Sequence, residues 1–138
     1  MKIQLITVLF LLFSTILSVS AQKKKKDIVS NKIKSITEIN EDFEKNNGRA
    51  VKESFTAYDE YGNIVELIEY DDNGKEKKHI KYEYDDKDNC TKETYLNAKG
   101  QLEKTVVFKY DDGIKIEKTT YLPNGKIKVR KKYVYQFH

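Results

Sequence analysis

Cysteine, histidine and tryptophan are scarce or absent in this chain of 138 residues, and these shortages limit what it can be. The single cysteine, Cys90, excludes a framework of disulfides within the chain. The two histidines, His79 on a predicted exposed strand face and His138 at the last position, give poor support for a Ser–His–acid site. No apolar run after residue 21 approaches the length of about 20 residues that a membrane span needs. The fold must therefore be held by packed secondary structure or by association between chains.

The first 21 residues, MKIQLITVLFLLFSTILSVSA, have the order of a secretory signal peptide. Lys2 precedes an apolar run from Ile3 to Leu17, and small residues follow as far as Ala21. We predict cleavage after Ala21 and export to the periplasm, the cell surface or the medium, with an uncleaved anchor as the alternative. The next stretch, 22–31, contains four consecutive lysines and is predicted to be a flexible basic leader.

Charged residues make up 35% of the chain, so large surfaces must face water. The net charge of +4 hides an asymmetry along the sequence. Residues 27–113 hold 14 basic and 21 acidic side chains, a net charge of −7. Residues 114–138 hold 7 basic and 1 acidic side chain, a net charge of +6. This asymmetry says more about possible partners than the overall balance does.

A short motif that begins with tyrosine recurs along the chain and marks its turns. Tyr58, Tyr84 and Tyr110 are spaced by 26 residues, and the six turn sequences are YDEYGN, YDDNG, YDDKDN, YLNAKG, YDDG and YLPNG. Asp or Asn at the start of a turn accepts hydrogen bonds from backbone amides two residues on, and Gly near the end adopts a positive φ. In YDDKDN, which lacks glycine, Asn89 is predicted to adopt that conformation. The motif predicts a repeat of β-hairpins.

Between these turns, apolar and polar residues alternate with the period of two that half-buried strands show. Ile80, Tyr82 and Tyr84 are predicted to share one face, opposite His79 and Lys81. Short turns permit only antiparallel neighbours. The predicted fold class is all-β, a single antiparallel meander sheet of seven or eight strands. We predict strands near 50–58, 64–70, 77–85, 90–96, 102–110, 114–121 and 126–137.

Two structural questions stay open at this point. Residues 32–47 fit either a helix or a first strand, and we favour the strand because a hairpin there would continue the repeat. The predicted domain, 32–138, would be one sheet with one apolar face, which must be covered. The sheet could curl on itself, or a second chain could stack on it.

The repeat resembles the YD-repeat (RHS-like) family of exported bacterial proteins. Three stretches carry the resemblance: YDEYGNIVELIEYDDNGK, YEYDDKDNCTKETYLNAKGQL and YDDGIKIEKTTYLPNGKI. In large members, such repeats form curved β-shells around protein cargo. This chain has about three units, so the resemblance implies a small exported β-meander with a binding or structural role, and it carries over no catalytic residue. MORN-like hairpin repeats are a second resemblance, but they contain more glycine and usually tryptophan.

The candidate binding site is a basic strip in the last predicted strand, formed by Lys126, Lys128, Arg130 and Lys132. Three of these side chains share one outward face and could hold an anionic partner, such as an envelope polysaccharide. The alternative is that the lysines protect an exposed sheet edge against stray pairing. Nucleic acid is not expected as the partner, because export removes the chain from it.

Two further candidates have simpler structural explanations. The oxygens of Asp85–Asn89 could hold Ca²⁺, but their spacing differs from an EF-hand loop and turn formation already explains them, so we predict no metal or other cofactor. Cys90 aligns with Ile64 and Ile116 in the repeat, so it is predicted to replace an apolar core residue. An intermolecular disulfide through this odd cysteine is the alternative.

The sequence thus favours an exported, non-enzymatic β-repeat module that binds an envelope polysaccharide or protein. One alternative is an envelope hydrolase with its site in a concavity of the sheet. The other is a purely structural protein that self-associates through its apolar sheet face.

Overall fold

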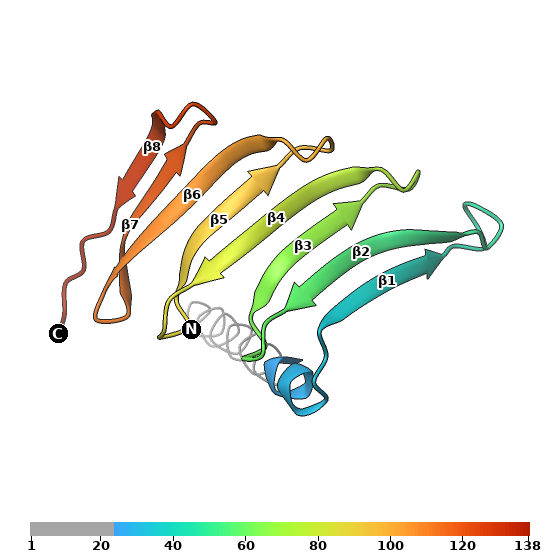
Figure 1. The fold of residues 1–138 in the computed structure, drawn as a ribbon, viewed down its shortest axis with the longest axis horizontal. Coiled ribbons are helices and arrows are strands. Elements are labelled where there is room, and N and C mark those ends of the chain that lie inside the picture. The colour runs from blue at the N-terminus through green and yellow to red at the C-terminus, as the bar shows by residue number, and fades with distance from the viewer. Residues whose placement is uncertain (1–23) are drawn as a thin grey trace, which may run out of the picture. The chain divides into compact units, whose positions relative to one another are not determined.

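The computed structural model describes residues 24–138, which contain one antiparallel sheet of eight strands in the order β1 to β8 (Figure 1). Each strand pairs with the next along the chain, and the sheet is not closed into a barrel. The predicted meander is therefore confirmed. The predicted signal peptide, 1–21, lies outside the described residues. The strands are β1 (Ser35–Glu41), β2 (Ala50–Tyr58), β3 (Ile64–Tyr70), β4 (Glu76–Tyr84), β5 (Cys90–Leu96), β6 (Leu102–Asp111), β7 (Ile114–Tyr121) and β8 (Ile127–Lys132).

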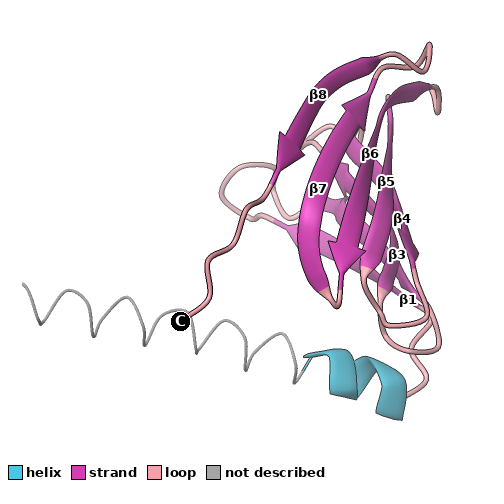
Figure 2. Cartoon of the chain, turned by 90° about the vertical axis from the view of Figure 1, so that its left-hand side faces the viewer, coloured by secondary structure: helices cyan, strands magenta, loops and turns pink. Residues whose placement is uncertain are grey.

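A helical segment, 24–30, precedes the strands within the stretch predicted to be a flexible leader (Figure 2). It belongs to a small unit with the turn Tyr58–Asn63, separate from the sheet unit. Ile28 is buried, and Lys25 Nζ donates to Asn63 Oδ1 at 2.7 Å. Contacts with the turn Tyr58–Asn63 thus hold the helical segment, although its lysine-rich composition alone predicts a solvated leader. No helix within 24–138 is long and apolar enough to cross a membrane.

The ambiguous segment 32–47 contains the strand β1, so the strand that we favoured is confirmed. β1 pairs antiparallel with β2, with Glu38 opposite Ser54, and the hydroxyl of Ser54 donates to the carboxylate of Glu38. After β1 the chain turns at Asp42, whose Oδ1 accepts the backbone N–H of Lys45 at 2.9 Å.

Five turns share one construction and begin at Asp59, Asp71, Asp85, Asn97 and Leu122. In the second turn, the N–H of Gly74 donates to the carbonyl of Asp71 at 2.8 Å, and Asp71 Oδ1 accepts the N–H of Lys75 at 2.9 Å. Gly74 has a φ of 78°, which lets the bulge next to the turn form without strain.

The prediction that Asn89 adopts a positive φ is wrong, because the residue at that turn position is Asp88, with a φ of 61°. The backbone N–H and the side-chain amide of Asn89 instead both donate to the carboxylate of Asp85. The remaining motif turn, YDDG at 110–113, is shorter than the other five. Asp111 pairs with Ile114, and the two residues between them, Asp112 and Gly113, both have positive φ values, of 45° and 78°.

A buried position recurs every 26 residues on one face of the sheet. Ser54, Ile80 and Val106 occupy it in β2, β4 and β6, with exposed fractions of 8%, 3% and 3%. Phe108, two residues beyond Val106, is also buried. These few apolar side chains form the sheet's share of the core within the described residues.

Tyrosine hydroxyls form links within three successive hairpins with almost the same period, at intervals of 26 and 25 residues. Each tyrosine donates to the carbonyl oxygen of the residue 20 positions earlier: Tyr84 to Ile64 (2.9 Å), Tyr110 to Cys90 (2.9 Å) and Tyr135 to Lys115 (2.7 Å). The repeated tyrosine therefore has a second role besides its ring. It satisfies a backbone acceptor where each strand of a hairpin begins.

The last strand is shorter than predicted, since β8 ends at Lys132 rather than near residue 137. In the register of β7 and β8, Glu117 lies opposite Lys132, so the first residue of β7, Ile114, would lie opposite Tyr135. In a longer β8, residues beyond Tyr135 would therefore have no partner in β7. The ladder continues for one further bond, from the N–H of Tyr133 to the carbonyl of Ile116 at 3.0 Å.

Candidate binding face

The register of the strands separates the side chains of the sheet into two faces, because residues directly opposite each other project to the same side. We name the first the Ile80 face. Its members across β4 to β8 include Ile80, Tyr82, Glu93, Tyr95, Val106, Phe108, Lys118 and Lys131. We name the second the Glu117 face. Its members include Glu66, His79, Lys81, Glu83, Lys92, Lys109, Glu117, Thr119, Arg130 and Lys132.

The Ile80 face combines aromatic rings with lysine ammonium groups. Lys104 Nζ lies 4.1 Å from the centre of the Tyr95 ring, and Lys115 Nζ lies 4.4 Å from that of Phe108. The hydroxyl of Tyr95 donates to Glu93 Oε2 at 2.8 Å. Burial, together with this hydrogen bond and the charge of Glu93, raises the pKa of Tyr95 well above its usual value. The ammonium groups of these lysines therefore lie over aromatic rings and make cation–π contacts with them.

Several ion pairs link neighbouring strands on the Glu117 face. Lys92 Nζ lies 2.8 Å from Glu83 Oε1, joining β5 to β4. Lys109 Nζ lies 3.4 Å from Glu117 Oε1, and Arg130 Nε lies 3.7 Å from the same oxygen. These pairs are exposed at their cationic partners, so each contributes little to stability on its own.

Glu117 is the acidic centre of the C-terminal part of this face. Desolvation acts to raise its pKa, but hydrogen bonds from Thr119 and Lys109, and the charges of Lys109 and Arg130, lower the pKa below its ordinary value. The Thr119 hydroxyl donates to Glu117 Oε1 at 3.0 Å. The carboxylate therefore stays ionised among several cations.

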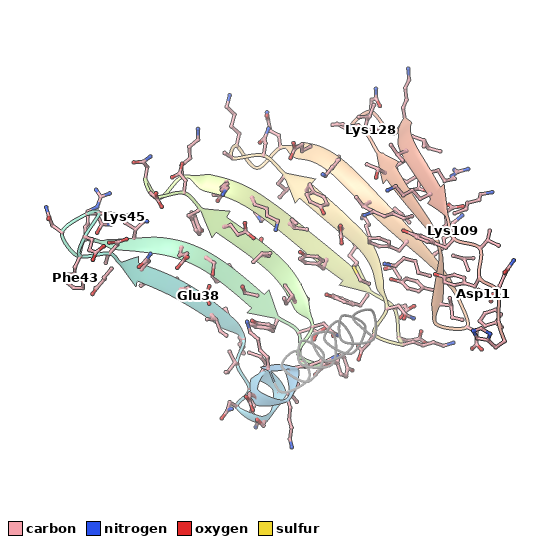
Figure 3. The ribbon with its side chains drawn as sticks, turned by 180° about the vertical axis from the view of Figure 1, so that it is seen from behind. Glu38, Phe43, Lys45, Lys109, Asp111 and Lys128 are labelled. Atoms are coloured by element: carbon pink, nitrogen blue, oxygen red, sulfur yellow. The ribbon has the colours of Figure 1, made fainter. Side chains whose placement is uncertain are left out.

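The structure brings together three of the four residues of the predicted basic strip. Arg130 and Lys132 are exposed on the Glu117 face, whereas Lys128, which is also exposed, lies at the bulge where the register with β7 shifts and is opposite no residue of β7. Lys128 lies on the last strand, far across the sheet from Glu38 on the first (Figure 3). Lys126 lies apart from them in the turn, where its backbone N–H donates to Asn124 Oδ1. Together with Lys109, the three strand residues form a group of four exposed cations, which we name the cationic strip. Lys109, Arg130 and Lys132 are the members next to Glu117.

His79 is held between two carboxylates rather than exposed to solvent as predicted. Its Nε2 lies 2.7 Å from Glu66 Oε1 and its Nδ1 lies 3.6 Å from Glu76 Oε2. Only 13% of its side-chain surface is accessible. The difference arises because Glu66 on the neighbouring strand β3 and Glu76 at the start of β4 extend long acidic side chains to the ring. His138 is exposed at the end of the chain.

The oxygens of Asp85–Asn89 form the turn itself. Hydrogen bonds from Asn89 and from backbone amides lower the pKa of the Asp85 carboxyl group and use both of its oxygens. Within residues 24–138, no cluster of three or more His, Cys, Asp or Glu side chains is arranged to hold a metal ion.

Cys90 is half-buried at the first position of β5, and its thiol approaches the carbonyl of Lys92 at 3.7 Å. Burial and the charge of Glu93 raise the pKa of the thiol. Cys90 and Ile64 occupy equivalent positions in the repeat, as predicted, because the backbone carbonyl of each accepts a hydrogen bond from a tyrosine hydroxyl. The equivalent residue in the third repeat is Lys115, whose carbonyl accepts a hydrogen bond from the hydroxyl of Tyr135, and not Ile116 as predicted.

Sequence reasoning missed a polar hollow in the sheet unit. It has a volume of about 480 Å³ and lies where the loop after β1 meets the turn after β3. Arg49, Lys52, Tyr70 and Asp72 are among the residues that line it, and Lys52 Nζ lies 5.2 Å from the centre of the Tyr70 ring. No spacing rule links these two loops, so only the tertiary structure brings them together.

No protein-family model and no curated protein matches the chain.

Proposed function

We propose that this chain is an exported, non-enzymatic β-repeat protein of the YD-repeat type that binds an anionic polysaccharide of the bacterial cell envelope. The observation that carries the proposal is the cationic strip on the Glu117 face. Three exposed cations, Lys109, Arg130 and Lys132, lie around one carboxylate, that of Glu117, and Lys128 adds a fourth charge farther along β8. The local excess of positive charge attracts a polyanion.

The spacing of the cationic strip favours a linear polymer over a small anion. Alternate residues of a strand lie about 6.5 to 7 Å apart, so Arg130 and Lys132 present neighbouring charges along β8, and Lys128 at the bulge extends the row. No groove or pocket is needed to bind a chain along such a row. Export, predicted from residues 1–21, would place the protein among the acidic polymers of the envelope.

The non-enzymatic part of the proposal is supported by the environment of His79. Its two ring nitrogens face Glu66 and Glu76, and neither contact is with a nucleophile. Asp85, the acidic residue most suggestive of a metal site, is engaged in its own turn.

The test is retention of the protein, in the form that the host accumulates, on immobilised polygalacturonate, with neutral dextran as the control polymer. We expect the triple variant Lys128→Glu, Arg130→Glu, Lys132→Glu to lose retention on polygalacturonate.

The matched control reverses three exposed turn lysines, by Lys75→Glu, Lys87→Glu and Lys99→Glu, and so changes the net charge by the same amount. We expect this control to keep most of the retention. Equal losses in the two triple variants, or retention that dextran matches, would contradict the proposal. The lysines of β8 would then be protectors of an edge strand.

A further inference from the structure

We propose that the two edge strands of the sheet, β1 and β8, pair with each other between different copies of this chain, so that copies join head to tail. This inference does not depend on polysaccharide binding. It rests on the free hydrogen-bonding direction of each edge, on the charges of the two strands and on the direction in which each strand runs.

Each edge strand has a single neighbour in the sheet, β2 for β1 and β7 for β8. Antiparallel ladders alternate, so every second residue directs its N–H and C=O away from the neighbouring strand. Because Tyr133 donates to Ile116 within the β8 register, Arg130 directs its backbone groups away from β7. Because Tyr58 donates to Lys34 within the β1 register, Thr37 directs its backbone groups away from β2.

The two edge strands carry charges of opposite sign. β1, with the sequence SITEINE, contains Glu38 and Glu41 and no basic residue. β8, with the sequence IKVRKK, contains four basic residues and no acidic one. Nearly all of these side chains are exposed, so the opposite charges are available to a partner strand. Opposite charges across a strand pair stabilise it, and like charges destabilise it.

This distribution of charge selects one kind of pairing among three. Two β8 strands would place cations opposite cations, and two β1 strands would place carboxylates opposite carboxylates. Only β1 of one copy against β8 of another brings opposite charges together. The lysines of β8 disfavour pairing with a second β8, as edge protection requires, but the same charges favour pairing with the acidic β1 of another copy.

The direction of the strands fits the same pairing. β1 and β8 are the first and last of eight alternating strands, so they run in opposite directions (Figure 1). A second copy in the same orientation therefore sets its β1 antiparallel to β8 and continues the meander. The contact is heterologous, so it leaves one free edge of each kind and can extend to further copies.

The experiment blocks one edge at a time with proline and uses alanine as the matched control. Arg130→Pro removes the outward N–H of β8, whereas Arg130→Ala removes the same charge and keeps the N–H. Thr37→Pro and Thr37→Ala form the corresponding pair on β1. The probe is a second copy of the protein, and the readout is mass by sedimentation velocity over a range of concentrations.

We expect the unmodified protein to form species larger than a dimer as its concentration rises, and both proline variants to remain monomeric. A mixture of Thr37→Pro with Arg130→Pro should form a one-to-one dimer, because one variant retains β8 and the other retains β1. The dimer also shows that both proline variants are folded. Both alanine variants should still associate, Thr37→Ala as the unmodified protein does and Arg130→Ala more weakly.

Several results would overturn the inference: an unmodified protein that stays monomeric, a proline variant that dimerises alone, or a mixture that stays monomeric although circular dichroism shows both variants folded. Salt gives a second reading on the unmodified protein. Its association should weaken severalfold as NaCl rises from about 0.05 M to about 0.5 M, because exposed charges are then screened. Polygalacturonate retention should fall alike in Arg130→Pro and Arg130→Ala, so the two proposals can fail separately.

Discussion

The Ile80 face and the Glu117 face are built from the same strands, yet different interactions stabilise them. The Ile80 face buries Ile80, Val106 and Phe108 and sets lysines over aromatic rings. The Glu117 face is covered by charged side chains that pair between strands, such as Lys92 with Glu83. The first face supplies most of the free energy that burial can give. The second remains charged in water, which is why we propose it as the face that binds a charged partner.

The largest expected effect comes from the Ile80 face. Ile80→Ala should lower the free energy of unfolding by about 2 to 5 kcal/mol, because it removes a buried side chain and leaves a cavity. Chemical denaturation measures the change. If that variant does not fold, Ile80→Val should cost about 0.5 to 1.5 kcal/mol.

The control for this prediction lies next to it in β4 on the opposite face. Lys81→Ala should change the free energy of unfolding by no more than about 0.5 kcal/mol, because Lys81 is exposed. Equal costs for Ile80→Ala and Lys81→Ala would remove the distinction between the two faces.

A smaller effect is expected where a tyrosine hydroxyl joins two strands. Tyr110→Phe should lower the free energy of unfolding by about 1 kcal/mol, because the carbonyl of Cys90 loses its hydroxyl donor in a partly buried position. Tyr135→Phe removes an equivalent bond to Lys115, but Tyr135 is 45% exposed, so water can replace the donor. Its cost should be clearly smaller, and urea titration of both variants checks the order. A larger loss for Tyr135→Phe would be incompatible with this explanation.

Acid should reveal the contribution of Glu117. Its folded pKa lies below the ordinary value of 4.5, so the carboxylate stabilises the fold above that pH. This contribution is lost as the pH falls through the folded pKa, when the carboxylate becomes protonated. Glu117→Gln should therefore reduce stability at neutral pH and flatten the decline of stability below about pH 4.5, as thermal unfolding at several pH values would show. An unchanged acid decline in the variant would mean that Glu117 has no such role.

Much of the fold could be predicted from local sequence signals. Alternation assigned Ile80 and Tyr82 to one face and His79 and Lys81 to the other, and the register confirms this. The turn motif placed the ends of most strands, because Asp and Gly act within a few residues of themselves. The basic residues of β8 were also identified in this way, since alternation alone puts Arg130 and Lys132 on one side.

The features that could not be predicted depend on contacts distant in sequence. β8 ends at Lys132 although its partner strand reaches a position opposite Tyr135, and no local pattern within β8 reveals this end. The carboxylate nearest His79, that of Glu66, comes from β3, 13 residues earlier in the chain. The order of the helical segment 24–30 depends on a turn more than 30 residues later, to which Lys25 donates a hydrogen bond at a separation of 38 residues.

The most direct test of the binding face compares two lysines of β8 that differ mainly in the face they occupy. Lys132 lies on the Glu117 face and Lys131 on the Ile80 face, and both are exposed. Titration of polygalacturonate into Lys132→Glu should show an affinity at least roughly threefold below that of the unmodified protein, as expected for reversal of an exposed charge within a cationic row. Lys131→Glu should stay close to the unmodified protein. Equal losses in both variants would mean that net charge, and not the Glu117 face, determines binding.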